Sequence, residues 1–162
     1  MRPLPTCKLN PKVTNVWRIS EAILVVLCWL CVCLPFLIAW LASGEAWLVP
    51  LNIALNAIAI VCLVFFVGVF PPLRYIRWRY EVGEHELDIT RGIFWRKRFV
   101  IPFIRVQNTD TKQGPLMRSV GLAQVTVATA AGEHEIPGLS VEEADALRDA
   151  IATQARLAQE DL

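Results

Sequence analysis

The chain has 162 residues, of which 55% are hydrophobic and 19% charged, and its formal net charge is +1. Soluble domains carry about 25% charged residues, and a nucleic-acid-binding domain needs a basic excess that is missing here. The charges are also unevenly spread, because none lies between Glu21 and Glu45 or between Glu45 and Arg74. The composition therefore predicts a membrane segment followed by a small polar domain, and excludes a nucleic-acid partner.

Two apolar runs, residues 22–42 and 47–70, are long enough to cross a bilayer. The first would be about 31 Å long as a helix, at ~1.5 Å per residue, which matches the hydrocarbon core. A tight turn at Ser43-Gly44-Glu45 joins the two runs. Because the connection is so short, we expect two antiparallel transmembrane helices that form a hairpin over residues 21–74.

Basic residues lie at the two outer ends of the hairpin and not in the turn that connects its helices. They are Arg2, Lys8, Lys12 and Arg18 before the first run, and Arg74, Arg77 and Arg79 after the second. The short turn between the runs has none, so the positive-inside rule places both termini in the cytoplasm. We expect a multi-pass membrane protein, with a basic cytoplasmic tail at residues 1–20 and a cytoplasmic domain at residues 75–162.

The apolar runs contain few polar side chains. Asn52 and Asn56 are four residues apart and therefore share one helix face, where they bond either to the first helix or to another subunit. No ionisable residue lies inside the runs, which argues against a channel or transporter. Cys28 and Cys31 have C-x-x-C spacing, so a membrane thiol-redox enzyme is one alternative, although thiols also serve as small apolar residues in such helices.

The polar domain begins with short stretches of alternating apolar and polar residues. Such alternation predicts half-buried strands, and glycines separate them. Residues 116–120 are predicted as one helical turn or a loop. The predicted strands cover residues 76–82, the surroundings of Leu87 and Ile89, residues 94–101, 104–112, 122–129 and 133–136.

The chain ends with a predicted amphipathic helix. Ser140 and Glu143 have the spacing of a capping box, in which each side chain bonds to the backbone N–H of the other residue. An apolar stripe follows at three- and four-residue spacing, formed by Ala144, Leu147, Ile151, Ala155 and Ala158. Six strands in meander order with one C-terminal capping helix predict a mainly-β, pleckstrin-homology-like (PH-like) half-open barrel.

The chain also resembles a known family, the bacterial PH-like-domain membrane proteins of the YdbS type. The matching stretches are residues 80–82, 87–92, 101–107, 113–122, 129–132 and 136–139. Val106 departs conservatively from the family pattern. The resemblance implies the fold, the two spans and a location in a bacterial inner membrane, and it implies a larger relative with repeated PH-like domains as a partner. It implies no defined activity, and we expect neither a cofactor, a metal nor a catalytic residue.

Two groups of polar residues are candidates for binding. The first matches the family pattern and is interpreted either as a partner surface or as residues that bond to loop carbonyls: Arg105, Gln107, Gln113 and Arg118. The second is interpreted either as a basic belt that faces anionic lipid or as topology signals with a solvated strand face: Arg74, Arg77, Arg79, Arg96, Lys97 and Arg98.

Three functions follow from these observations. The first is a non-enzymatic membrane-anchored module that docks a protein partner or self-assembles at the inner leaflet. The second is a sensor of anionic lipid or of envelope stress. The third is the thiol-redox protein based on Cys28 and Cys31.

Overall fold

The computed structural model describes residues 4–160, so Arg2 lies outside the described residues. The chain divides into two compact units. One is Trp17–Pro72, and the other combines the N-terminal segment up to Val16 with the chain from Leu73 onward. The predicted combination of a helical hairpin and a PH-like domain is confirmed by their contents.

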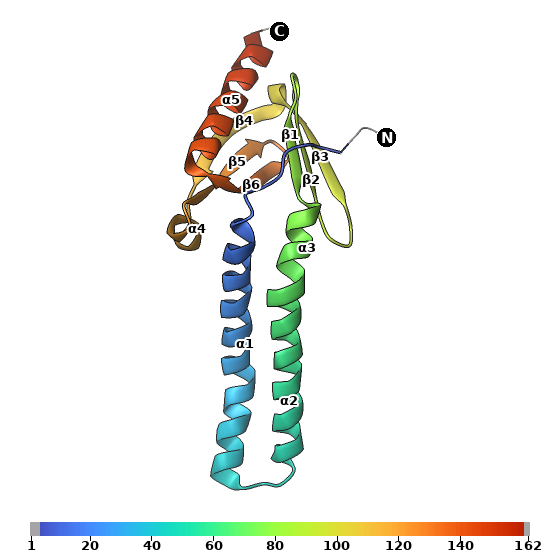
Figure 1. Cartoon of the computed structure of the whole chain (residues 1–162), viewed down its shortest axis with the longest axis vertical. Helices are drawn as coiled ribbons and strands as arrows, with labels where there is room; N and C mark the ends of the chain where they lie inside the picture. The colour runs from blue at the N-terminus through green and yellow to red at the C-terminus, as the bar shows by residue number, and fades with distance from the viewer. Residues whose placement is uncertain (1–3, 161–162) are drawn as a thin grey trace. The chain divides into compact units, whose positions relative to one another are not determined.

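The hairpin consists of two long apolar helices that run antiparallel (Figure 1). Helix α1 spans Val13–Ser43, and α2 spans Leu48–Leu63. After α2 the helix continues through a π-helical segment, Val64–Val69, into α3, Phe70–Arg77. Both continuous helices, of 31 and 30 residues, are long and apolar enough to cross a membrane. The first contains all of the predicted span 22–42, and the second contains residues 48–70 of the predicted span 47–70; both helices extend further at the ends predicted to be cytoplasmic.

Polar side chains join the two helices of the hairpin. The Trp29 Nε1 donates a hydrogen bond of 2.9 Å to the Asn56 Oδ1. The Asn52 Nδ2 donates to the Phe36 carbonyl oxygen at 3.3 Å and to the Leu48 carbonyl oxygen at 2.9 Å. Both amides thus have partners on the first helix of the hairpin.

The second unit contains two antiparallel sheets, each of three strands in sequence order. The first sheet is β1–β2–β3, and the second is β4–β5–β6. A short helix, α4, lies between β4 and β5, and helix α5 ends the chain. Their bounds are β1 Arg79–Val82, β2 Glu86–Arg91, β3 Lys97–Pro102, β4 Val106–Lys112, α4 Pro115–Ser119, β5 Leu122–Thr129, β6 Gly132–Ser140 and α5 Val141–Glu160.

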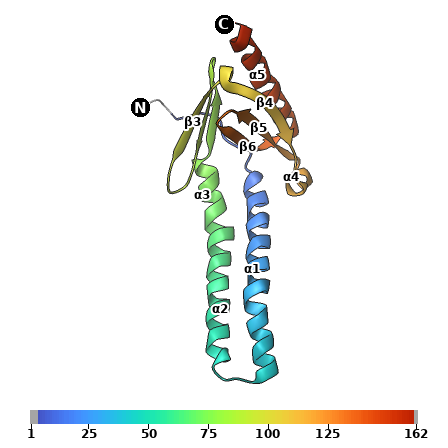
Figure 2. The same ribbon diagram turned by 180° about the vertical axis from the view of Figure 1, so that it is seen from behind.

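Helix α5 packs on the second sheet, as Figure 2 shows. The predicted capping box forms, because the Glu143 N–H donates to the Ser140 Oγ at 3.2 Å and the Ser140 N–H donates to the Glu143 Oε2 at 2.9 Å. On the predicted apolar stripe, Ala144, Ile151 and Ala155 are buried. The helix therefore forms where the sequence indicates, and its apolar face contributes to the core.

The N-terminal segment is part of the domain. Cys7 and Tyr80 exchange two backbone hydrogen bonds of 3.1 Å at the free edge of β1, and the Asn10 N–H donates to the Gly138 carbonyl oxygen at 2.8 Å. Leu9 and Val13 are buried. Residues 1–20 were predicted as a tail separate from the domain, whereas the structure places the described residues up to Val16 in the same unit as the domain. Only tertiary contacts identify this segment, because it has no regular pattern of its own.

Several predicted strand boundaries were wrong. The first strand begins at Arg79, not Ile76, because α3 continues to Arg77. The fourth begins at Val106, not residue 104, because Phe103–Arg105 form a 3₁₀ turn, η2. Phe94 and Trp95 lie in the β2–β3 turn instead of the third strand. Finally, β6 continues through Pro137 and Gly138, since a bulge between Ile136 and Leu139 accommodates both residues.

Candidate functional site

The two sheets diverge on one side of the domain and leave a hollow. Strands β3 and β4 are each an outer strand of their sheet, and η2 joins them directly. The hollow has a volume of about 900 Å³, within the range of ligand-binding clefts. It is lined by residues 98–102 of β3, residues 104–107, Thr129 at the end of β5, residues 130–131 of the β5–β6 turn, His134 and Gln159.

The lining of the hollow combines exposed apolar residues with basic and neutral polar ones. Val100 and Ile104 are 40% and 41% exposed, which is high for branched apolar residues in a folded domain. Arg105 and Gln107 are exposed beside them. Among the described residues that line the hollow, none carries a carboxylate. The surface is therefore suited to an occupant with apolar groups and negative charge.

His134 forms part of one wall. Its ring centroid lies 4.9 Å from that of Phe99, and the Arg91 guanidinium lies 5.0 Å above the Phe99 ring. The His134 Nδ1 is buried and has no hydrogen-bond partner among the described residues. Burial, with a smaller contribution from the charge of Arg91, lowers the pKa of His134 below its usual value. The neutral imidazole is thus favoured in the folded domain.

This lowered pKa predicts a stability that depends on pH. As the pH falls below about 6.5, the unfolded chain binds a proton at His134 before the folded chain does. We therefore expect the urea midpoint of unfolding to fall with pH from that point until the lower folded-state pKa is passed. This fall of the urea midpoint with pH should disappear in His134→Gln, whereas it should remain in His85→Gln, which changes a histidine in an exposed turn. Identical pH profiles for the protein and His134→Gln would contradict the assignment.

Comparisons with known proteins agree with this architecture. The family model described as "Bacterial PH domain" matches residues 15–155. The chain belongs to the bacterial PH domain family. This bacterial PH domain protein is 39% identical over 162 residues to "UPF0699 transmembrane protein YdbS" of Bacillus subtilis (strain 168), and the alignment covers all of both chains.

A second relative matches over part of the chain. "UPF0699 transmembrane protein YdbT" of Bacillus subtilis (strain 168) is 27% identical over 100 residues, which are 59% of this chain and 20% of that protein. No solved structure gave a significant match. The predicted likeness to the YdbS type is confirmed, and the chain is a membrane protein with a bacterial PH domain.

The four family-matching polar residues of this bacterial PH domain do not form one cluster. Arg105 and Gln107 line the hollow. Gln113 and Arg118 lie beyond the other end of β4, which is seven residues or roughly 23 Å long. There the Gln113 Nε2 donates to the carbonyl oxygen of Leu122, the first residue of β5, at 2.9 Å. Arg118 is exposed on α4.

The six residues of the predicted basic belt also differ in their surroundings. The Arg98 Nε donates to both carboxylate oxygens of the buried Asp88, at 3.0 and 2.9 Å, and this bond raises the pKa of Arg98. The Arg79 Nη1 donates to the Trp78 carbonyl oxygen at 2.6 Å. Arg74 and Arg77 are half-buried on α3, whereas Arg96 and Lys97 are exposed at the β2–β3 turn.

Other candidate chemistry is limited in the described part of the chain. Cys28 and Cys31 are free thiols on the exposed surface of α1. Within residues 4–160, no group of three or more His, Cys, Asp or Glu residues is arranged to hold a metal ion. These thiols and the hollow of the bacterial PH domain are separate features, since the thiols belong to the hairpin unit.

Part of the hollow of this bacterial PH domain was not predicted from the sequence. Val100 and Ile104 were interpreted only as strand residues, and His134 as an exposed polar residue of the predicted strand 133–136. The period-two pattern predicts which residues alternate, but it does not show that β3 and β4 end as outer strands of different sheets. Arg105 and Gln107 were found because they match the family pattern.

Proposed function

We propose that this chain is a non-enzymatic docking module, anchored in a bacterial inner membrane, whose cytoplasmic PH domain binds a protein partner in the hollow between β3 and β4. The observation that carries this function is the hollow itself, which lies between the outer strands of two sheets. Such strands have backbone N–H and C=O groups available for pairing on one side. An extended peptide that adds to a strand edge uses those groups, and neighbouring pockets select its side chains.

The lining supports a particular kind of partner segment. Val100 and Ile104 offer apolar contacts at the mouth, and such exposed apolar surface marks interaction sites. Arg105 supplies positive charge, and no carboxylate lies among the described lining residues to neutralise it. The occupant that fits is an extended segment with apolar and acidic side chains. The resemblance implies that a larger membrane protein with further PH-like domains supplies this segment.

The cytoplasmic location rests on the charge distribution around the hairpin. Lys8, Lys12 and Arg18 precede the first span, and three arginines follow the second, whereas the connection at Ser43-Gly44-Glu45 has no basic residue. Short loops with an excess of Lys and Arg remain in the cytoplasm. A partner would therefore approach the hollow from the cytoplasm.

A second candidate function is the sensing of anionic lipid or of envelope stress. It is favoured by one observation, the exposure of Arg96 and Lys97 in a turn that carries no acidic residue. Each basic residue near an anionic surface contributes about 1 kcal/mol to binding. Arg98 supports this function less, because its guanidinium already binds Asp88.

A photocrosslinking experiment tests the docking function. A photoreactive amino acid at position 104 of the full chain, in its native membrane, should form a crosslink to one protein, with the crosslinked peptide rich in acidic residues. Adding Arg105→Glu reverses the charge beside the hollow and should reduce the crosslink at least ~10-fold, the equivalent of about 1.4 kcal/mol.

The matched control is Arg118→Glu, which makes the same change at an exposed arginine outside the hollow. It should leave the crosslink at position 104 unchanged. Equal loss with both variants would assign the effect to net charge and contradict a site in the hollow. A crosslink between two copies of the chain would replace the partner by self-assembly, and no protein crosslink would refute docking.

A further inference from the structure

The β2–β3 turn carries the two most exposed large apolar side chains in the described part of the chain. Phe94 is 76% exposed and Trp95 is 82% exposed, more than any such residue on the apolar helices. Arg96 and Lys97 follow them, and both are exposed. Aromatic rings beside basic residues are typical of segments that lie at the membrane–water interface. Exposed apolar surface of this kind requires an explanation in a folded domain.

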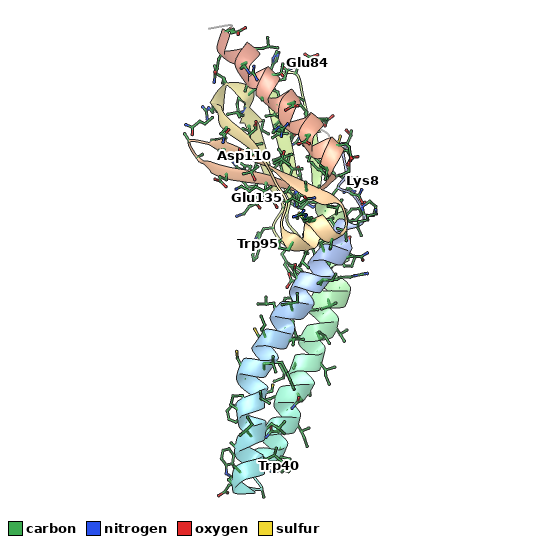
Figure 3. The ribbon with its side chains drawn as sticks, turned by 90° about the vertical axis from the view of Figure 1, so that its left-hand side faces the viewer. Lys8, Trp40, Glu84, Trp95, Asp110 and Glu135 are labelled. Carbon is green, nitrogen blue, oxygen red and sulfur yellow. The ribbon has the colours of Figure 1, made fainter. Side chains whose placement is uncertain are left out.

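The register of the sheet places this turn next to the point where the chain leaves the membrane helix. Strand β1 begins at Arg79, two residues after α3 ends, and Arg79 pairs with Thr90. The next residue of β2, Arg91, pairs with Lys97, and the turn lies between them. The turn is therefore at the end of the sheet where the second span connects. Figure 3 shows Trp95 and Glu84 at opposite ends of the domain.

The shape of the turn is fixed by its own backbone. Gly92 has a φ of +112°, a backbone conformation that residues with a side chain rarely adopt. A Cβ at this position would overlap the Trp95 carbonyl oxygen, so the chain folds back closely over Gly92. Arg91, which precedes it, is held above the Phe99 ring. The outward position of Phe94 and Trp95 thus belongs to a defined turn.

We propose that the β2–β3 turn, residues 92–96, together with Lys97 at the start of β3, is a second membrane contact of this protein. Phe94 and Trp95 enter the interfacial layer of the bilayer, and Arg96 and Lys97 lie among the lipid phosphates. The occupant is a lipid surface because the register brings the turn to the membrane-proximal end of the sheet, and because the turn has basic but no acidic residues. This inference goes beyond the docking function and does not depend on it.

Such a contact has a consequence for the domain. The second span is joined to β1, and the N-terminal segment that pairs with β1 leads into the first span. The turn, held at the same bilayer surface, would add a further attachment of the first sheet through the β2–β3 pair. The hollow extends along β3 toward Pro102, at the end of the strand opposite the turn. The orientation of the hollow relative to the membrane would then be restricted. This restriction favours binding of a membrane-bound partner, because less rotational entropy is lost when the two proteins associate.

The test uses the full chain in vesicles, with a genetically encoded, environment-sensitive fluorescent amino acid at position 94 or, as the matched control, at the exposed position Glu84. All native cysteines and Trp95 are kept. At position 94 we expect a blue-shifted emission, several-fold stronger quenching by spin-labelled lipids and weaker quenching by aqueous iodide than at position 84. Adding Trp95→Ser should weaken the lipid quenching at position 94.

Vesicles of phosphatidylcholine alone and of phosphatidylcholine with phosphatidylglycerol separate the two components of the contact. Lipid quenching at position 94 in both supports insertion of the aromatic residues. Quenching only with phosphatidylglycerol would overturn the aromatic anchor and leave a purely electrostatic contact. Equal emission and quenching at positions 94 and 84 would overturn the membrane contact altogether, whether or not the hollow docks a partner.

Discussion

Phe103→Ala is expected to lower the free energy of unfolding of the domain by about 3–5 kcal/mol, the usual range for a fully buried phenylalanine. Phe103 has an exposed fraction of 0% and lies in η2, where the chain passes from β3 to β4. Its truncation leaves a cavity where two sheets and α5 meet, since α5 also contacts η2. Urea unfolding of the full chain in detergent micelles, followed by near-ultraviolet circular dichroism, measures the change.

Phe94→Ala is the matched control, because it removes the same side chain from a site that is 76% exposed. We expect a change within about 0.5 kcal/mol there, as for most surface substitutions. A loss at Phe103 no larger than that at Phe94 would mean that the η2 turn does not form part of the core. A large loss of stability in Phe103→Ala would mean that the buried Phe103 ring holds η2 in place. It would thereby also position Ile104 and Arg105, the next two residues, in the lining of the hollow.

The elements that the sequence predicts correctly are those with a strong local signal. The two spans are evident because a bilayer excludes charge over a length that only an apolar helix satisfies. Helix α5 is evident because Ser140 and Glu143 form a capping box immediately before an apolar stripe. In both cases the residues that specify the element lie within the element itself.

Elements specified by distant residues are predicted less well. The alternation from Ile76 to Val82 is compatible with a strand, but α3 continues to Arg77, so the first two residues of the pattern are helical. Around η2, Pro102 retains extended dihedral angles and the chain then turns within three residues. Nothing local distinguishes that turn from the start of β4. The position of Phe103 in the core depends on both sheets and on α5, which are separate in sequence.

The same distinction applies to the candidate site. The resemblance identified Arg105 and Gln107, and the structure brings them to one hollow. It gives Gln113 a backbone partner at the other end of β4. His134 escaped prediction because an isolated histidine between two glutamates is indistinguishable from an exposed one. Its burial follows from contact with Phe99, 35 positions earlier in the chain.

The N-terminal segment is likewise held by contacts with residues that are distant in sequence. A substitution at Gly138 tests these contacts. Gly138 lies in the bulge of β6 with a φ of +67°, and its carbonyl oxygen accepts the Asn10 N–H. A Cβ at this position would lie 2.5 Å from the Cβ and the Cγ2 of Val13, which is buried at the start of α1. There is thus no space for a side chain between β6 and this segment.

Gly138→Ala is therefore expected to destabilise the domain by about 2–5 kcal/mol. Of this, about 1–2 kcal/mol comes from the left-handed backbone conformation and ~1–3 kcal/mol from overpacking against Val13. Gly121→Ala separates the two contributions, because Gly121 has nearly the same φ of +69° and no atom within 4 Å of an added Cβ. We expect only the backbone cost there. Equal losses in the two variants, measured by urea unfolding, would show that the N-terminal segment is not packed against β6.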